Sequence, residues 1–285
     1  MIRVSEAISV VCEALNIGEE KLAEDLGVTY ETINHWKRGK KPIDIESLEK
    51  LYSYAYRKGI KFNKIYEQLH KEEYSDSQNI VLFHGAKKSF SLPIDFSSNS
   101  KNRNDFGVGF YLGETFEQAA NYISYLDVPY VYCFKLNLTD LKIYKFGVNT
   151  EWMLAIAYFR GWMSDFRECK CLQNTLKKIK SSDVIIAPIA DNRMFDLIAE
   201  FIEGNITDEQ CKHSLAATNL GFQYVLKTDK AVEQVSFIEK MFVCKKEKEE
   251  CIEKRASLTN DGIQKVKMAR ISYKGKGKYF EELLK

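Results

Sequence analysis

The chain has 285 residues, of which 45% are hydrophobic and 29% are charged, so it has room for two domains with buried cores. This is the composition of an ordinary globular protein, and a net charge of +2 gives no global attraction to nucleic acid. No apolar run approaches the roughly 18 to 20 residues that a membrane span needs, so no membrane partner is expected. Seven cysteines without a metal-type cluster fit a reducing compartment, and we expect a cytoplasmic protein without a metal ion.

Residues 1–70 are predicted to be helical. The first helix has its apolar residues at helical spacing, at Val4, Ala7, Ile8, Val11 and Leu15. A second helix ends at Gly27, and Thr29 can cap the next helix over residues 30–37. A last helix begins near Asp44, after Pro42.

This order of helices resembles the helix-turn-helix of the phage-repressor (lambda repressor/Cro-like) family over roughly residues 5–58. The matching residues are Leu22-Ala23, Leu26-Gly27-Val28, Thr32-Ile33, Trp36 and Gly39. In that family the exposed face of the second helix enters the major groove of DNA. The resemblance implies a DNA-binding set made of Thr29, Tyr30, Thr32, Asn34, His35, Lys37 and Arg38.

The charge balance of this region leaves a second interpretation open. Residues 1–70 carry 11 Lys and Arg against 11 Asp and Glu, so they lack the basic bias that drives nonspecific DNA affinity. Folds of this kind also serve as protein-docking or autoinhibitory modules. The sequence therefore predicts either a DNA contact or a docking role for the helical domain.

The polar, turn-rich residues 71–79 are predicted to be a linker, and the pattern of apolar and polar residues changes after them. Short apolar runs alternate irregularly with helical patterns over residues 80–243, which predicts an α+β domain. Strands are predicted at 80–83, 128–138, 141–144, 182–188, 222–226 and 235–243, and helices at 115–126, 151–166, 191–204 and 208–218. Residues 86–104 are predicted to be a long loop.

Residues 244–285 are predicted to be a charged C-terminal tail that begins as a solvated helix. From Lys245 onward it has 12 Lys and Arg against 7 Asp and Glu. Lys274, Lys276 and Lys278 alternate with glycines near its end. This pattern indicates either a mobile surface tail or a flexible arm that contacts nucleic acid.

Four short motifs after residue 80 resemble the ADP-ribosyltransferase fold, in the branch of diphtheria toxin and the poly(ADP-ribose) polymerases. They are His84-Gly85 after an apolar strand, Gly107-Val108-Gly109-Phe110-Tyr111, Ala119-Ala120-Asn121-Tyr122 and Gln223-Tyr224-Val225-Leu226. The whole of 80–243 is also similar to an uncharacterised bacterial family of this type, which is often found beside helix-turn-helix sequences. The resemblance implies split antiparallel sheets with helices, and NAD as the substrate.

The resemblance implies that His84, Tyr111 and Gln223 are the catalytic positions. Its cofactor-binding set is His84, Gly85, Phe110, Tyr111, Tyr122 and Arg193. Gly85 can bring its backbone to the nicotinamide carboxamide, His84 can donate to a ribose hydroxyl, and Tyr111 and Tyr122 can sandwich the ring. Each also has a structural alternative: a histidine satisfied after its strand, tyrosines in the core, glycines that only form a turn, and an Arg193 salt bridge at a helix start.

Gln223 departs from the family pattern, which has glutamate there. An amide can still bind the ribose 2′-OH, but it has no charge and cannot act as a base. Chain elongation is therefore not expected, whereas a single transfer or an inactive NAD-binding domain remains open. Arg103, Asp105 and Glu114 lie near the glycine stretch and could supply charge.

These observations predict an NAD-dependent mono-ADP-ribosyltransferase that modifies a macromolecule, protein or nucleic acid, as a toxin or phage-defence effector. The partners expected are NAD, the acceptor, DNA at the helix-turn-helix, and an antitoxin. Two alternatives stay open. One is a DNA-binding regulator whose second domain only senses NAD, and the other is an NAD glycohydrolase.

Overall fold

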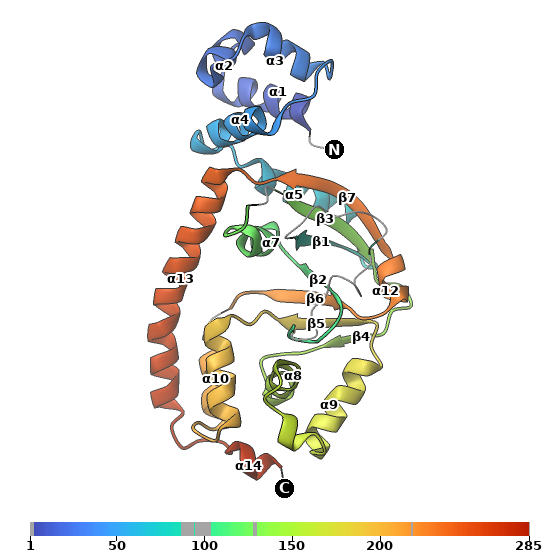
Figure 1. Cartoon of the computed structure of the whole chain (residues 1–285), viewed down its shortest axis with the longest axis vertical. Coiled ribbons are helices and arrows are strands. Elements are labelled where there is room, and N and C mark those ends of the chain that lie inside the picture. Colours follow the sequence, from blue (N-terminus) through green and yellow to red (C-terminus); the bar gives the residue numbers. More distant parts are fainter. Residues whose placement is uncertain (1–2, 87–93, 95–103, 128–129, 218, 285) are drawn as a thin grey trace. The chain divides into compact units, whose positions relative to one another are not determined.

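The computed structural model describes residues 3–86, 94, 104–127, 130–217 and 219–284, which form an α+β protein (Figure 1). The chain divides into two compact units. The first unit is Met1–Ser89, Thr115–Lys135 and Ser236–Lys254, and the second is Phe90–Glu114, Leu136–Val235 and Arg255–Lys285. Within the described residues, every helix falls short of the length and apolar character that a bilayer crossing requires.

The first unit begins with the predicted helices. They are α1 (Val4–Leu15), α2 (Glu19–Leu26), α3 (Tyr30–Lys37) and α4 (Ile45–Arg57). Gly27 ends α2 with φ = 67°, a left-handed conformation that favours glycine. Thr29 Oγ1 accepts a hydrogen bond from Thr32 N (3.2 Å), and the Asp44 carboxylate accepts one from Ser47 N (2.9 Å). Both predicted helix starts are therefore confirmed.

A fifth helix, α5 (Phe62–Tyr74), enters the stretch 71–79 that was predicted to be a linker. Asn63 Nδ2 donates to the carbonyl oxygen of Phe242 (2.7 Å) and to Glu247 Oε2 (2.6 Å). One turn from the end of α5, the buried His70 Nε2 lies 2.8 Å from Glu239 Oε2. Buried polar contacts therefore join α5 to later parts of the first unit.

Strands β1 (Asn79–Gly85), β3 (Tyr130–Asn137) and β7 (Val235–Phe242) are neighbours in the order β1-β3-β7. Helix α7 (Phe116–Ile123) packs on β1. It starts with a capping box in which Thr115 and Gln118 each accept from the other's backbone N–H. The strands predicted over 80–83 and 235–243 are confirmed.

The second unit contains β2 (Phe110–Gly113), β4 (Ile143–Lys145), β5 (Val184–Pro188) and β6 (Phe222–Leu226), in the order β4-β5-β6-β2. β6 is antiparallel to both β5 and β2, but β4 and β5 are parallel. The expected antiparallel pairing is therefore confirmed for β6 with β5 and β2, but β4 and β5 make the sheet mixed. Two helices lie between β4 and β5 in the chain, so the chain returns to the same end before it starts the second strand.

The helices of the second unit are α8 (Thr150–Arg160), α9 (Lys170–Lys180), α10 (Asn192–Ile202), α11 (Asp208–Ala216) and α12 (Asp229–Glu233). Figure 1 shows α8, α9 and α10 grouped beside β4, β5 and β6. The helix predicted over 151–166 ends early, because Gly161 takes φ = 87° and a 3₁₀ turn, Ser164–Phe166, follows. Helices α9 and α12 were not predicted.

Residues after Lys245 form α13 (Lys245–Ser272) and α14 (Phe280–Leu283). The carbonyl oxygen of Lys278 accepts from Asp208 N (2.9 Å), and that of Lys276 accepts from Thr207 Oγ1. Phe280 is 1% exposed. The solvated helix predicted from Lys245 is therefore confirmed as α13, and the end of the chain after it packs against α11.

The cysteines differ in state. Cys169 and Cys171 form a disulfide, which the expectation of reduced cysteines did not include. The remaining cysteines have free thiols, and Cys133, Cys211, Cys244 and Cys251 are buried. The free, buried thiols behave as small apolar side chains of the two cores.

Candidate functional site

In the first unit, the His84-Gly85 pair lies at the end of β1, against α7. A Cβ atom built on Gly85 would lie 2.6 Å from the carbonyl oxygen of Ala119 and 2.9 Å from Ile123 Cγ2. It would also lie 3.3 Å from Tyr122 Cδ1, so the structure brings Gly85 and Tyr122 together. His84 is half-buried. Packing on the α7 backbone is thus a sufficient reason for glycine at position 85.

The ring of Tyr122 is accessible to a ligand. Its side chain is 57% exposed, while Ala119 and Ala120 lie on the buried face of the same helix. The neighbouring Tyr125 is 63% exposed. Tyr122 is therefore a surface aromatic and not part of the core, which was the alternative interpretation.

In the second unit, Tyr111 and Gln223 lie on the same face of the sheet. Tyr111 pairs with Val225, and Gly113 pairs with Gln223, across the antiparallel β2–β6 pair. Residues two apart on a strand share a face, so Tyr111, Gly113 and Gln223 line one side. Phe110 pairs with Leu226 on the opposite side and is 4% exposed. The structure therefore separates Phe110 from Tyr111.

The Tyr111 hydroxyl anchors the turn before β2. It donates a hydrogen bond to the carbonyl oxygen of Gly107 (2.7 Å) and accepts one from Phe106 N (3.1 Å). Burial raises the pKa of Tyr111. Gly107 takes φ = 71°, and a Cβ there would lie 2.8 Å from the ring of Phe159. Tyr111 therefore holds the glycine turn, whatever its ring also contacts.

A buried polar cluster surrounds Gln223. Gln223 Nε2 donates to Asp105 Oδ2 (3.1 Å) and to the carbonyl oxygen of Pro188 (3.4 Å). Arg160 Nη2 donates to the other carboxylate oxygen, Asp105 Oδ1 (2.6 Å), and its guanidinium lies 3.7 Å from the ring centroid of Phe195. Gln223 and Asp105 are each 8% exposed. The cluster is thus a buried hydrogen-bond network in which Arg160 and Gln223 donate and Asp105 accepts.

Lys227, the residue after β6, supports the same turn. Its Nζ donates to the carbonyl oxygen of Phe106 (2.6 Å) and to that of Val108. Burial lowers the pKa of Lys227 to about 8. Sequence reasoning missed this residue, although the two-residue period from Gln223 through Val225 to Lys227 is a signal that could have found it. Arg160, at the end of a distant helix, left no such signal.

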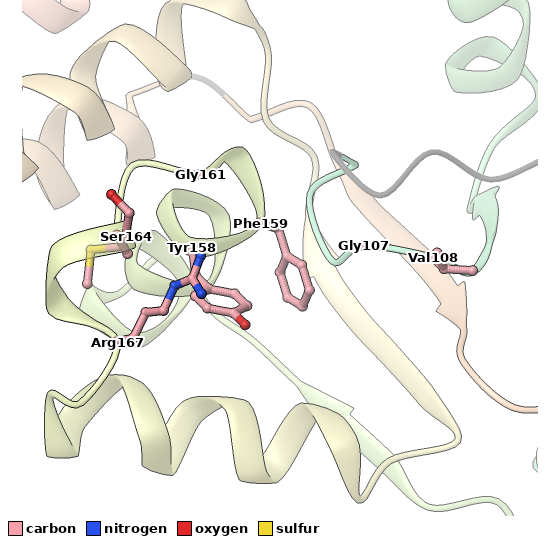
Figure 2. Close-up of a pocket in the computed structure, with 8 residues that line it drawn as sticks. Gly107, Val108, Tyr158, Phe159, Gly161, Ser164 and Arg167 are labelled. Carbon is pink, nitrogen blue, oxygen red and sulfur yellow. The ribbon is translucent and has the colours of Figure 1, made fainter.

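A pocket of about 400 Å³ lies beside the glycine turn (Figure 2). Gly107 and Val108 line it on one side, and Tyr158, Phe159 and Arg167 line it on the other. Figure 2 shows the ring of Phe159 directed toward Gly107. Aromatic rings and a guanidinium are side chains that contact flat or negatively charged groups.

The other charged candidates have structural partners. Arg193 donates to Asp191 Oδ2 (3.0 Å) and to the carbonyl oxygen of Thr259 (2.8 Å), which is the salt bridge weighed against a pyrophosphate contact. Glu114 Oε1 accepts from Phe222 N (3.2 Å). Arg103, like most of the loop predicted over 86–104, lies outside the described residues. Nowhere in the described part of the chain do three histidine, cysteine or acidic residues gather as a metal-binding group.

The predicted DNA-binding residues lie on α3 and at its two ends. Tyr30 is 47% exposed, and Arg38 is exposed just after the helix. Lys37 Nζ instead lies 2.6 Å from Glu19 Oε1. The half-buried members are Thr32, Asn34 and His35. Thr29 caps α3, so its side chain is committed to the helix start.

The fold and these sites define an α+β protein in which a helical N-terminal region precedes a mixed-sheet region with a buried Asp-Gln-Arg cluster. The chain belongs to the family described as "Protein of unknown function (DUF3990)", whose model matches residues 80–237. The match runs from β1 to the start of β7 and therefore includes both Gly85 and Gln223. Neither a curated protein nor a solved structure matches the chain.

Proposed function

We propose that the chain is an NAD-dependent mono-ADP-ribosyltransferase that modifies a macromolecule. The observation that supports this most is the Gln223 amide, which lies on the same sheet face as Tyr111, with a glycine opposite it. The motifs that resemble the ADP-ribosyltransferase fold fall on ordered elements: His84-Gly85 ends β1, and Tyr122 is exposed on α7. The side chains of Ala119 and Ala120 on α7 are buried, whereas the ring of Tyr122 is exposed and can contact a ligand.

In this proposal the residues bind and orient NAD and do not attack it. The family resemblance assigns His84 and Gly85 to the nicotinamide ribose and carboxamide, and Tyr111 and Tyr122 to stacking on the ring. Gln223 accepts a hydrogen bond from the ribose 2′-OH. The glycosidic C–N bond breaks, nicotinamide leaves with the bonding electrons, and the acceptor's nucleophile forms the new bond to the anomeric carbon. Rate is gained by position and electrostatics.

Gln223 also limits the reaction. An amide cannot take a proton from a weak nucleophile such as a sugar hydroxyl. A single transfer to an acceptor that is already nucleophilic suits this site, and chain elongation does not. We propose that the transfer acts as a toxin or phage-defence activity, which would need an antitoxin partner in the cell that makes it.

The first test uses NAD labelled in its adenylate part, incubated with the purified chain and cell lysate. We expect a labelled macromolecule, and His84→Ala should abolish the label. Tyr122→Ala should raise the KM for NAD about fivefold, since an aromatic stack contributes on the order of 1 kcal/mol. Label that persists unchanged in His84→Ala would refute the site.

Tyr125→Ala is the matched control, because it removes an equally exposed tyrosine just after the same helix. It should leave the KM for NAD unchanged. Release of free ADP-ribose without any labelled acceptor would identify an NAD glycohydrolase instead. NAD binding without nicotinamide release would identify a sensor domain.

A second activity, DNA binding by α3, is proposed from its capped start and exposed surface. We expect binding to duplex DNA that weakens as salt rises. Arg38→Ala should reduce the slope of log K against log salt by about one, as expected for one lost phosphate contact. Lys37→Ala should change it less, because Glu19 already neutralises that lysine.

Lys64→Ala is the control for this test, since it removes an exposed lysine from α5 and not from α3. It should leave the slope unchanged. If the chain binds no DNA even at low salt, the helical region is a protein-docking module, which is the alternative left open by its balanced charge.

A further inference from the structure

The Gln223 amide can meet a substrate with either of two ends. A glutamate at this place presents an acceptor oxygen in both orientations. An amide presents either an oxygen, which accepts, or an NH₂ group, which only donates. A ribose hydroxyl that must donate to the protein is held by the oxygen alone. The orientation of the amide therefore decides whether glutamine can replace glutamate.

The contacts of Gln223 fix that orientation. Both groups near its terminal nitrogen are acceptors: Asp105 Oδ2 at 3.1 Å and the carbonyl oxygen of Pro188 at 3.4 Å. If the amide turned over, its oxygen would face two oxygens, and three buried acceptors would be left without a donor. The nitrogen must therefore point toward Asp105.

The amide oxygen is then the end left for a ligand. Among the described residues, Oε1 of Gln223 accepts no hydrogen bond, and it is not one of the fully enclosed polar atoms that lack a partner. Its neighbours across the two adjacent strands are Gly113 and Ala187. These two residues have the smallest side chains, and neither carries a polar side-chain group that could bond to the amide oxygen.

We propose that Asp105 is a positioning residue that turns the Gln223 amide oxygen toward the ribose 2′-OH. This inference rests on the proposed transfer of ADP-ribose, and it explains how the chain keeps an acceptor at the position where the resembling family has a carboxylate. Arg160 completes the arrangement, because its hydrogen bond to Asp105 Oδ1 (2.6 Å) leaves Oδ2 for the amide and balances the buried charge.

The test exchanges the donor and the acceptor of the hydrogen bond between Gln223 and Asp105. The rate of nicotinamide release is measured for each variant. Asp105→Asn can donate to the amide oxygen of Gln223 and should lower kcat/KM roughly tenfold or more. Gln223→Glu places two carboxyl groups side by side, so the two groups must share one proton. Its rate should fall as pH rises and both groups ionise.

The double variant, Asp105→Asn with Gln223→Glu, restores one donor and one acceptor. We expect it to recover at least the wild-type rate and to lose the new pH dependence. A merely structural role for Asp105 predicts losses that add instead. Asp183→Asn is the matched control: Asp183 accepts from Lys142 N (2.9 Å) and Thr228 Oγ1 (2.8 Å) in the same unit, away from the cluster.

A second measurement does not depend on activity. The side-chain NH₂ signals of Gln223, identified in ¹H–¹⁵N spectra by their loss in Gln223→Glu, should exchange slowly with solvent in the wild-type chain. Asp105→Asn should make this exchange fast. If the wild-type chain consumes no NAD while the NH₂ group is protected, the proposed function fails and the amide orientation stands.

Two results would overturn the inference. One is NH₂ exchange in the wild-type chain as fast as that of an exposed glutamine. The other is a double variant whose loss of rate equals the sum of the losses of the two single variants.

Discussion

Both the packing of Gly85 and the proposed binding of a ligand to its backbone require a residue without a side chain. The carbonyl oxygen of Ala119 would lie 2.6 Å from any Cβ at this position, and a helix backbone cannot move aside cheaply. A ligand that approaches the backbone of Gly85 would also need the side chain to be absent. The sequence pattern suggested only the second reason, because the first depends on where α7 packs.

We expect Gly85→Ala to destabilise the chain by about 1–3 kcal/mol, as overpacked substitutions do, and this can be measured by urea unfolding. Gly147→Ala is the matched control, since nothing lies within 4 Å of a Cβ there and its φ is not left-handed. Equal stability of the two variants would show that α7 can shift to accommodate a methyl group at little cost in free energy.

At the cluster around Gln223, the residue types were predictable and their partners were not. The strand pattern identified Gln223, and its distance from Asp105 in sequence is 118 residues. Only the pairing of β6 with β2 brings the turn that carries Asp105 over that strand. Arg160 reaches the same carboxylate from a helix 55 residues away.

At the scale of elements, local signals predicted boundaries well wherever caps and turns set them. Helix α3 starts at Tyr30 because Thr29 caps it, and α4 starts after Asp44 for the same reason. Strand β2 was not predicted, because its four residues lie within a glycine-rich stretch. Its identity as a strand comes from hydrogen bonds to β6, which are tertiary contacts.

The first two turns of α13 carry two glutamates, Glu247 and Glu250, in opposite environments. Burial raises the pKa of Glu247 to about 8, although Asn63 Nδ2 donates to it (2.6 Å). Hydrogen bonds from Lys61 and Tyr56 lower the pKa of Glu250 to about 2. The two carboxyl groups therefore make stability depend on pH in opposite directions.

The folded state binds a proton at Glu247 more tightly than the unfolded state, in which the pKa of this carboxyl group is 4.5. Its contribution to stability is therefore complete below pH 4.5 and is lost as pH rises through about 8. We expect the midpoint temperature of unfolding to fall over this window in the wild-type chain. Glu247→Gln should remove that fall.

Glu250→Gln is the control on the same helix, because its contribution is present above pH 4.5 and lost as pH falls toward about 2. It should lower stability at neutral pH and leave the fall between pH 4.5 and 8 intact. A wild-type curve that is flat between these values would contradict the buried, protonated state of Glu247.

At the scale of the whole molecule, the helical N-terminal region is part of the first compact unit. Tyr52 of α4 has ring contacts with Phe62 (5.0 Å between centroids) and with Phe242 of β7 (5.2 Å). The interpretation of residues 1–70 as a separate domain rested on a polar stretch. Within the first unit, α5 and Tyr52 contact residues of β7, and α5 also contacts α13.

We expect α3 and β7 to unfold together. Tyr52→Ala should lower the free energy of opening by about 3 kcal/mol for amides of both elements, as measured by native-state hydrogen exchange. Tyr30→Ala, which removes an exposed tyrosine from α3, should change neither. A loss of protection in α3 alone would show that the helical N-terminal region unfolds independently.

The amino-acid sequence by itself determined the α+β fold class and most helix and strand positions, and its NAD-site motifs stay a prediction. These follow from periodicity, caps and short motifs, which act over a few residues. Tertiary structure decided that β4 and β5 are parallel, that the C-terminal segment packs through Phe280, and that Asp105 and Arg160 gather at Gln223. Those features depend on contacts between distant residues, and no local pattern encodes them.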